Sequence, residues 1–178
     1  KASFDSIDVL QGTFIRKSFT VDGSLDQRFI LDNPSIDTST IIVHVRDSDS
    51  QQDSGVLFTK VDNILNVKPT STTFLIQEIQ DEKYELLFGD GIFGRKIENG
   101  KTIDVTYIVT DGKDGNGPSS FTFAGTITNN NNALVSLNAT PIVNKVRAAS
   151  NGSDIEQIDS IKYFAPRLYS SQYRAVTA

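Results

Sequence analysis

The sequence contains no cysteine, methionine or tryptophan and a single histidine among its 178 residues. Without cysteine, neither a disulfide bond nor a thiolate metal site can form. No apolar run approaches the roughly 18 residues that a membrane-spanning helix needs, so we expect no membrane association. The chain is long enough to bury a substantial core, and an apolar content of 38% with 22% charged residues is typical of a globular protein.

Strong helix formers are also scarce. Ala, Leu and Glu together supply 25 residues, whereas the β-branched residues Ile, Val and Thr supply 47. Branched side chains suit pleated strands and lose rotamer freedom in helices, and the abundant Asp, Asn, Ser and Gly residues favour turns. The composition therefore predicts a mainly β fold, α+β at most, with an antiparallel sheet or sandwich-like body and one short helix near the C-terminus.

Segments rich in branched or alternating residues predict the individual strands. These segments are residues 7–21, 28–31, 40–46, 56–61, 64–67, 74–79, 83–88, 102–110, 121–127 and 141–149. The polar residues 80–82 between two of them indicate a hairpin, and Asn99-Gly100 is the strongest short hairpin signal in the chain.

One helix is expected near the C-terminal end. Ser153 followed by Glu156 matches a capping box, whose side chains satisfy free amides at a helix start. Three isoleucines then recur at three-residue spacing on one helical face: Ile155, Ile158 and Ile161. Because Pro166 should stop the helix, the pattern predicts a helix over about residues 154–164.

The same signals predict the domain organisation. We expect residues 1–152 to form a β-rich body, in which two subdomains could meet near residues 68–73. Residues 153–178 should form the helix and an exit segment that leads to the next part of a longer parent chain, because the sequence begins at Lys1 without an initiator methionine.

The charge of the chain is uneven. Its net value of −5 argues against nucleic-acid binding. Residues 22–62 hold eight Asp against three basic residues, whereas residues 162–178 contain no acid and carry a charge of +3. Tyr and Arg often anchor protein interfaces, so we expect assembly contacts with a neighbour's acidic surface at Arg167, Tyr169, Tyr173 and Arg174. The alternative is that this segment simply begins the next domain.

Residues 89–94 match the pattern G-x-G-x-x-G. A dinucleotide site needs a helix directly after this pattern, but Asn99-Gly100 interrupts the chain there. We therefore interpret Gly89, Asp90, Gly91 and Gly94 as a structural turn whose glycines adopt positive φ angles. Ile92 and Phe93 are expected to anchor this turn.

Other patterns give only weak hints of chemistry. Asp47, Asp49 and Asp53 have the first spacings of a calcium loop but lack its Gly and its final Glu, which leaves a weak cation site as an alternative to solvated turns. His44 is expected on the same face of a predicted strand as Ile42 and Arg46, and nothing in the sequence identifies partners for a catalytic triad. We therefore expect no enzyme activity, no cofactor and no metal centre.

Two segments of the chain carry a series of short motifs. The first contains, in order, Phe88-Gly89-Asp90-Gly91, Phe93-Gly94-Arg95, Asn99-Gly100, a strand over 103–109 and a Gly-rich loop over 112–117. The second, over 163–178, contains Ala165-Pro166 and the run Arg174-Ala175-Val176-Thr177. Together these motifs resemble the baseplate J-like family of contractile-tail phages. Residues 32–47 fit the family's entry strand, whereas the four-Asn tract at 129–132 departs from its pattern.

The resemblance implies a structural module of a baseplate wedge protein, most similar to those of T-even-type phages. Such a module would sit in the virion tail after assembly in the host cytoplasm, form the ring around the tail hub, and take part in its rearrangement on sheath contraction. The implied partners are other copies of itself, as a homo-oligomer, and other wedge proteins. The composition also leaves open a β-sandwich binding module, such as an adhesin or carbohydrate-binding domain.

Overall fold

The computed structural model describes residues 9–24, 26–47, 55–123, 125–129, 131, 133–135 and 147–171. The chain divides into two compact units, residues 1–111 and residues 112–178, and each is described by itself. The boundary predicted at residues 152/153 lies inside the second unit.

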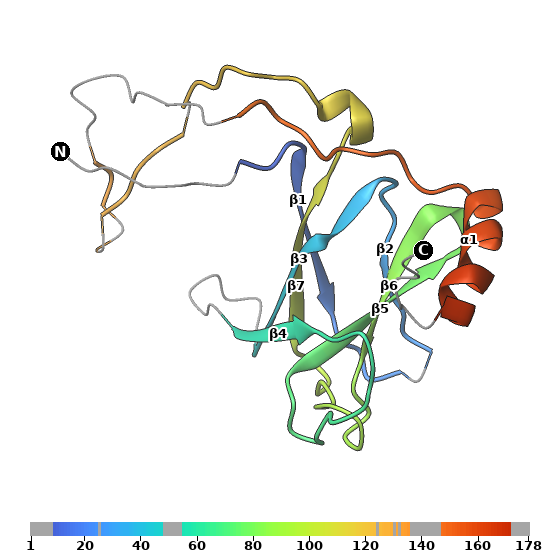
Figure 1. Ribbon diagram of the computed structural model, residues 1–178. Coiled ribbons are helices and arrows are strands. Elements are labelled where there is room, and N and C mark those ends of the chain that lie inside the picture. The colour runs from blue at the N-terminus through green and yellow to red at the C-terminus, as the bar shows by residue number, and fades with distance from the viewer. Residues whose placement is uncertain are drawn as a thin grey trace. The chain divides into compact units, whose positions relative to one another are not determined.

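The first unit is a seven-stranded sheet in the order β1-β7-β3-β4-β5-β6-β2 (Figure 1). In chain order the strands are β1 (Thr13–Thr20), β2 (Phe29–Leu31), β3 (Ile36–Arg46), β4 (Val56–Lys60), β5 (Thr73–Ile79), β6 (Lys83–Phe88) and β7 (Thr102–Val109). All neighbouring strands are antiparallel except β4 and β5, which run parallel and share two residue pairs. The predicted mainly β fold is confirmed.

The buried core lies against one face of the central strands β7 and β3. Ile103, Val105 and Tyr107 alternate along β7 and are fully buried, and Val43 and Val45 of β3 are buried beside them. Successive side chains of a strand point to opposite faces, so the branched and aromatic residues at alternate positions all reach the same core. The alternation of residues 102–110 predicted β7, and the branched residues throughout 40–46 predicted β3.

Aromatic rings within this core connect the two halves of the sheet, which are β1-β7-β3-β4 and β5-β6-β2. Phe88 at the end of β6 packs against Phe29 of β2, Phe58 of β4 and Phe74 of β5, with ring centroids 5.4, 5.8 and 6.2 Å away. The first two contacts are edge-to-face, an arrangement that the ring quadrupole favours. Phe88 is therefore the residue that fixes the end of β6 to both halves of the sheet.

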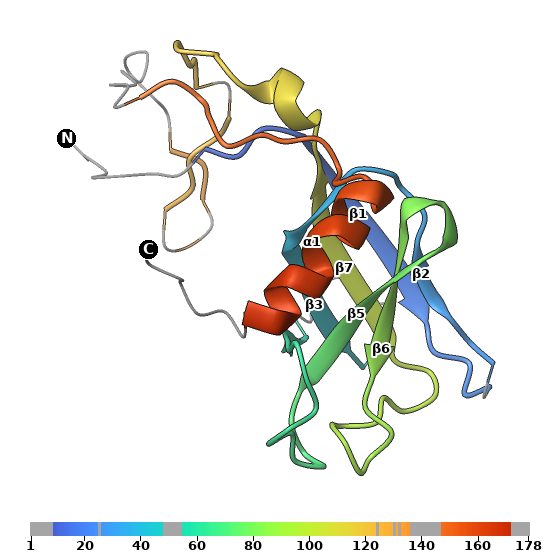
Figure 2. The same ribbon diagram turned by 45° about the vertical axis from the view of Figure 1, so that its right-hand side comes forward.

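The sheet coils until its edge strands β1 and β2 come together (Figure 2). Phe19 and Phe29 meet edge-to-face across this gap at 5.6 Å. The Lys17 ammonium donates to the Ile30 carbonyl at 3.0 Å and to the Asp32 carboxylate at 2.6 Å. A lysine on an edge strand also discourages pairing with a second chain, so this contact closes the sheet and protects its edge.

Two predicted elements of the first unit differ in the structure. Residues 64–67 form a turn and not a strand: Asn66 has φ +73°, and the Val67 amide donates to the Ile64 carbonyl at 3.2 Å. Asn side chains compete with ladders through local hydrogen bonds, and here Asn63 accepts one from the Leu65 amide at 3.1 Å.

The hairpin predicted at Asn99-Gly100 is also wrong, although a turn is present. Gly100 has φ +83°, and the Lys101 amide donates to the Glu98 carbonyl at 3.3 Å. The residues before this turn form no strand, because β7 pairs instead with β1 and β3. The hairpin predicted between β5 and β6 is confirmed, with the short 3-10 helix η1 (Gln80–Glu82) at its tip.

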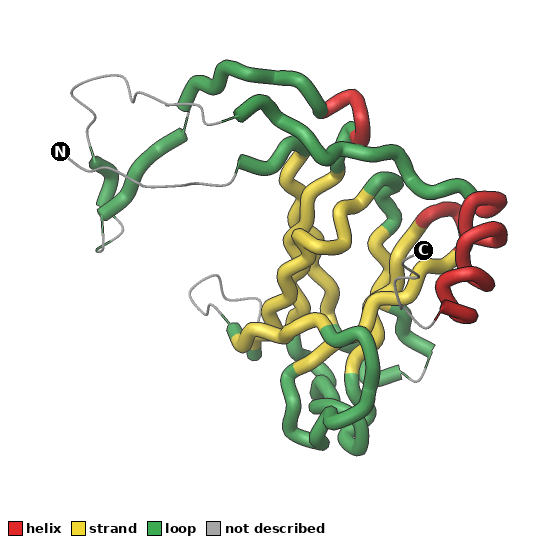
Figure 3. Tube along the Cα trace, viewed as in Figure 1, coloured by secondary structure: helices red, strands yellow, loops and turns green. Residues whose placement is uncertain are grey.

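Apart from its helix, the described part of the second unit contains little regular structure (Figure 3). A second 3-10 helix, η2 (Gly112–Gly115), opens it, and one isolated bridge joins Thr128 to Leu134. The strand predicted over 121–127 is absent from the described residues of that range. Most of the strand predicted over 141–149 lies outside the described residues.

The one α-helix among the described residues, α1 (Ile158–Ser171), begins later and ends later than predicted. The Glu156 carboxylate accepts from the Ser160 hydroxyl at 2.7 Å, so it does not complete a capping box with Ser153. Asp154 is held instead by Lys113 at 2.7 Å. Pro166 lies inside the helix, where it removes one backbone hydrogen bond without ending the helix.

Candidate functional site

The turn over residues 89–94 is built on the close approach of two glycines. A Cβ atom on Gly89 would lie 2.2 Å from the carbonyl carbon of Gly94, so no side chain fits there. Gly91 and Gly94 have φ angles of +96° and +92°, which L side chains rarely adopt. The Gly91 amide closes the turn by donating to the Gly94 carbonyl at 3.0 Å.

Asp90 holds the tip of this turn. Its carboxylate accepts from the amides of Ile92 and Phe93 at 2.8 and 2.9 Å. The hydrogen bonds from Phe93 and Ile92 lower the pKa of Asp90. Ile92 and Phe93 were expected to anchor the turn, but they are 65% and 51% exposed, so that prediction is wrong. Phe88 supplies the anchor, and the two apolar side chains are presented to solvent.

A second loop lies beside this turn at the same end of the sheet. The Arg95 amide donates to the Ser71 carbonyl at 2.8 Å, and both views show the loops after β4 and β6 next to each other (Figures 1 and 2). We call residues 61–72 and 89–101 the loop end. The loop end exposes four large apolar side chains: Ile64, Leu65, Ile92 and Phe93.

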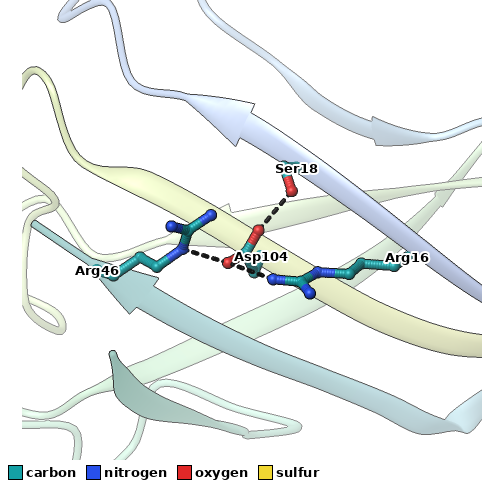
Figure 4. A network of polar contacts seen from close by, with 4 residues as sticks. All are labelled: Arg16, Ser18, Arg46 and Asp104. Atoms are coloured by element: carbon teal, nitrogen blue, oxygen red, sulfur yellow. Dashed lines mark hydrogen bonds and ion pairs between the residues drawn. The ribbon is translucent and has the colours of Figure 1, made fainter. Parts of the chain in front are cut away.

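A buried charge network crosses the opposite face of the sheet from the core (Figure 4). Asp104 of β7 accepts hydrogen bonds from Ser18 and Arg46, and Arg16 contacts it at 3.1 Å. Burial opposes ionisation of Asp104, but the bonds from Arg46, Ser18 and Arg16 outweigh it and lower its pKa to about 2. The carboxylate thus ties β1 and β3 to β7.

Sequence reasoning missed this network, although a signal was present. Asp104 interrupts the run Ile103–Val109, which otherwise consists of β-branched residues and Tyr107. Asp is depleted in strands, and an acid in such a strand normally requires a buried partner. The partners themselves could not be identified, because Arg16 and Arg46 lie on strands far from β7 in the sequence.

The other chemical candidates do not form a reaction centre within the described residues. His44 is half-buried opposite Asp104, and Asp47 pairs with Lys101 at 2.5 Å, a bond that lowers the pKa of Asp47. Asp49 and Asp53 lie outside the described residues. Among the residues that the structure describes, no three His, Asp or Glu side chains lie close enough together to hold a metal ion.

In the second unit, segments 112–118 and 149–154 run side by side, and we call this arrangement the junction clasp. Backbone bonds join Gly117 N to Ala149 O and Ala149 N to Pro118 O, both at 2.9 Å. The Asn116 side chain donates to the Gly152 carbonyl and accepts from the Gly152 amide, each at 2.8 Å. The clasp holds the residues that were predicted to begin the helix.

Two of the four predicted assembly contacts lie on α1. The Arg167 guanidinium stacks on the ring of Tyr163 at 3.7 Å, and Tyr169 is 88% exposed. Tyr173 and Arg174 lie outside the described residues. Several other large apolar side chains of α1 are exposed: Ile158, Ile161 and Phe164. No helix in the described ranges is long and apolar enough to cross a membrane.

Comparison with known proteins relates the chain to phage baseplates. No family model matches it. It is similar to the baseplate wedge protein gp6 of Enterobacteria phage T4, with 30% identity over 132 residues. The alignment covers 65% of this chain and 20% of that protein, so the chain spans about a fifth of the length of this curated relative. This similarity supports the baseplate resemblance drawn from the sequence.

Proposed function

We propose that this chain is a structural module of a bacteriophage baseplate wedge protein and that it acts through protein contacts and not through catalysis. The observation that carries the proposal is the similarity to a baseplate wedge protein over 65% of the chain. The structure of the chain is compatible with this proposal: among the candidate chemical residues that it describes, Asp47 is engaged in an ion pair and His44 lies on a strand without forming part of a metal-binding group.

Two surfaces support a role in protein contacts. The loop end presents Ile92 and Phe93 on a turn that cannot collapse inward, because Gly89 and Gly94 are already in contact. Helix α1 presents an exposed apolar face and the Arg167–Tyr163 stack. Aromatic residues and Arg are enriched in interface hot spots, so both surfaces suit binding to neighbouring subunits.

In this proposal the module resides in the tail baseplate of the virion after assembly in the host cytoplasm. Its neighbours are further copies of the same chain and other wedge proteins, which together form the ring around the tail hub. The module moves as a part of that ring when the sheath contracts.

Immunogold electron microscopy of purified phage particles tests the location. Antibodies raised against the 178-residue chain should label the distal end of the tail, and antibody pre-absorbed with the chain is the control. Label on the capsid, or particles without label, would contradict the proposal.

A glycan array run on the same chain tests the alternative function, a carbohydrate-binding module. A baseplate structural module should bind no sugar on the array.

A further inference from the structure

The chain holds three Asn-Gly steps, at residues 99–100, 116–117 and 151–152. In such a step the glycine amide nitrogen can attack the Asn side-chain carbon, forming a new C–N bond in a succinimide ring while the side-chain nitrogen leaves as ammonia. Water then opens the ring to Asp or isoaspartate, without any oxidant or reductant. The reaction requires the glycine amide to lose its proton and approach the side chain.

In the structure all three glycine amides are engaged in hydrogen bonds. Gly100 donates to the Val21 carbonyl at 2.8 Å, and Gly117 donates to the Ala149 carbonyl at 2.9 Å. Both bonds belong to reciprocal backbone pairs, because the partner residues donate in return to Lys101 and Pro118. These two Asn-Gly steps are therefore protected from deamidation by backbone hydrogen bonds, whose groups no side-chain substitution removes.

The third step is protected differently. The Gly152 amide donates to the side-chain oxygen of Asn116 at 2.8 Å, and the nitrogen of the same side chain returns a bond to the Gly152 carbonyl. Asn151 itself is exposed, has φ +75°, and its side chain forms no hydrogen bond to the described residues. One side chain thus controls the amide that would attack Asn151.

We propose that Asn151 is a spontaneous deamidation site and that Asn116 suppresses its reaction. Loss of the Asn116 bonds frees the Gly152 amide next to an unrestrained Asn side chain. Deamidation would add a negative charge three residues before Asp154, and the isoaspartate product would add a backbone carbon inside the junction clasp, seven residues before the start of α1. This inference is independent of the proposed function.

The test measures deamidation of the 178-residue chain in mildly alkaline buffer at physiological temperature by peptide mapping with mass spectrometry. The chain unfolded in urea gives the unprotected rates. Folded wild type should react more slowly at all three steps. In Asn116→Ala, the reaction at Asn151 should accelerate roughly fivefold, as expected for the loss of an ordinary hydrogen bond, while Asn99 keeps its wild-type rate.

Asn63→Ala is the matched control, because it removes an Asn side chain that binds a backbone amide in the other unit. It should leave the rate at Asn151 unchanged. Equal rates at Asn151 in wild type and in Asn116→Ala would overturn the proposal. If Asn116→Ala unfolds, the reaction at Asn99 will accelerate as well. In that case hydrogen exchange of the Gly152 amide in the wild-type chain is measured instead. Slow exchange of this amide supports the proposal, and exchange at the rate of the unfolded chain overturns it.

Discussion

Asp104 of β7 is bound by Arg46, its diagonal neighbour on β3, and not by His44, the residue directly opposite. Diagonal cross-strand neighbours lie within reach of a long side chain. Arg46 and Asp104 are only 5% and 6% exposed, so neither group can recover its hydration if the other is removed. The pair therefore constrains both the register of the two strands and the charge state of the sheet face.

Asp104 should make stability depend on acid pH. Its pKa falls from 3.8 to about 2 on folding, so its contribution is complete above about pH 4 and is lost as the pH falls toward 2. The shift corresponds to roughly 2 kcal/mol. Asp104→Asn should lower the free energy of unfolding near neutral pH by about 3 kcal/mol, since it also removes the buried negative charge that Arg46 binds.

Urea titrations at neutral and acid pH measure this effect. The difference in stability between wild type and Asp104→Asn should shrink as the pH falls through the range from 4 to 2. Asp26→Asn, a change at an exposed acid, is the control and should have little effect at either pH. A difference that stays constant with pH would show that Asp104 contributes nothing through ionisation.

Gly89 and Gly91 should respond differently to substitution. Gly89→Ala places a methyl group 2.2 Å from the Gly94 carbonyl carbon, and we expect a loss of more than about 3 kcal/mol because the backbone must move. A Cβ on Gly91 meets only Lys96, at 3.8 Å, so Gly91→Val should lose roughly 1–3 kcal/mol through its positive φ alone. Thermal unfolding ranks the two variants, and an equal loss would refute the steric argument.

Lys17 should matter for closure of the sheet. Lys17→Met keeps most of the side-chain length but removes the hydrogen bonds to Ile30 and Asp32. We expect a loss of about 1 kcal/mol and increased self-association, because the β1 and β2 edges lose their charged protection. Chemical denaturation and size-exclusion chromatography measure the two effects. A variant as stable and as monodisperse as wild type would show that the aromatic contact alone closes the sheet.

Charge reversal at the C-terminal end tests the assembly contacts of the proposed function. Arg167→Glu combined with Arg174→Glu should weaken association, most visibly at low salt, with little change in the Tm of the chain. Lys60→Glu combined with Lys83→Glu makes the same charge change in the first unit and should not weaken association. Sedimentation velocity measures the association of copies of the chain. A large fall in Tm would indicate that Arg167 and Arg174 support folding instead.

The sequence-based predictions succeeded where short-range patterns decide the structure. Alternation along residues 102–110 identified β7, because burial of one sheet face imposes a period of two. The branched residues throughout 40–46 identified most of β3. The β5–β6 hairpin followed from two apolar runs separated by three polar residues. These features depend on neighbours in the sequence.

Two of the failures depend on contacts that sequence patterns do not reveal. The start of α1 was misplaced because Lys113 and Asn116 hold residues 152–154 in the junction clasp. Ile92 and Phe93 were expected to anchor the turn, but they are exposed, because apolar character alone does not ensure burial. Their exposure depends on the Gly89–Gly94 contact.

The parallel pairing of β4 with β5 is the strand pair of the sheet that we expect to resist mechanical force least. Only Thr59–Thr73 and Lys60–Phe74 are paired there, whereas β3 and β7 share seven pairs and β5 and β6 share six. If β3 and β6 were pulled apart, only a few backbone hydrogen bonds and the packed rings of Phe58, Phe74 and Phe88 would hold β4 and β5 together. The sheet should tear between β4 and β5 first, leaving two antiparallel halves whose own ladders remain intact.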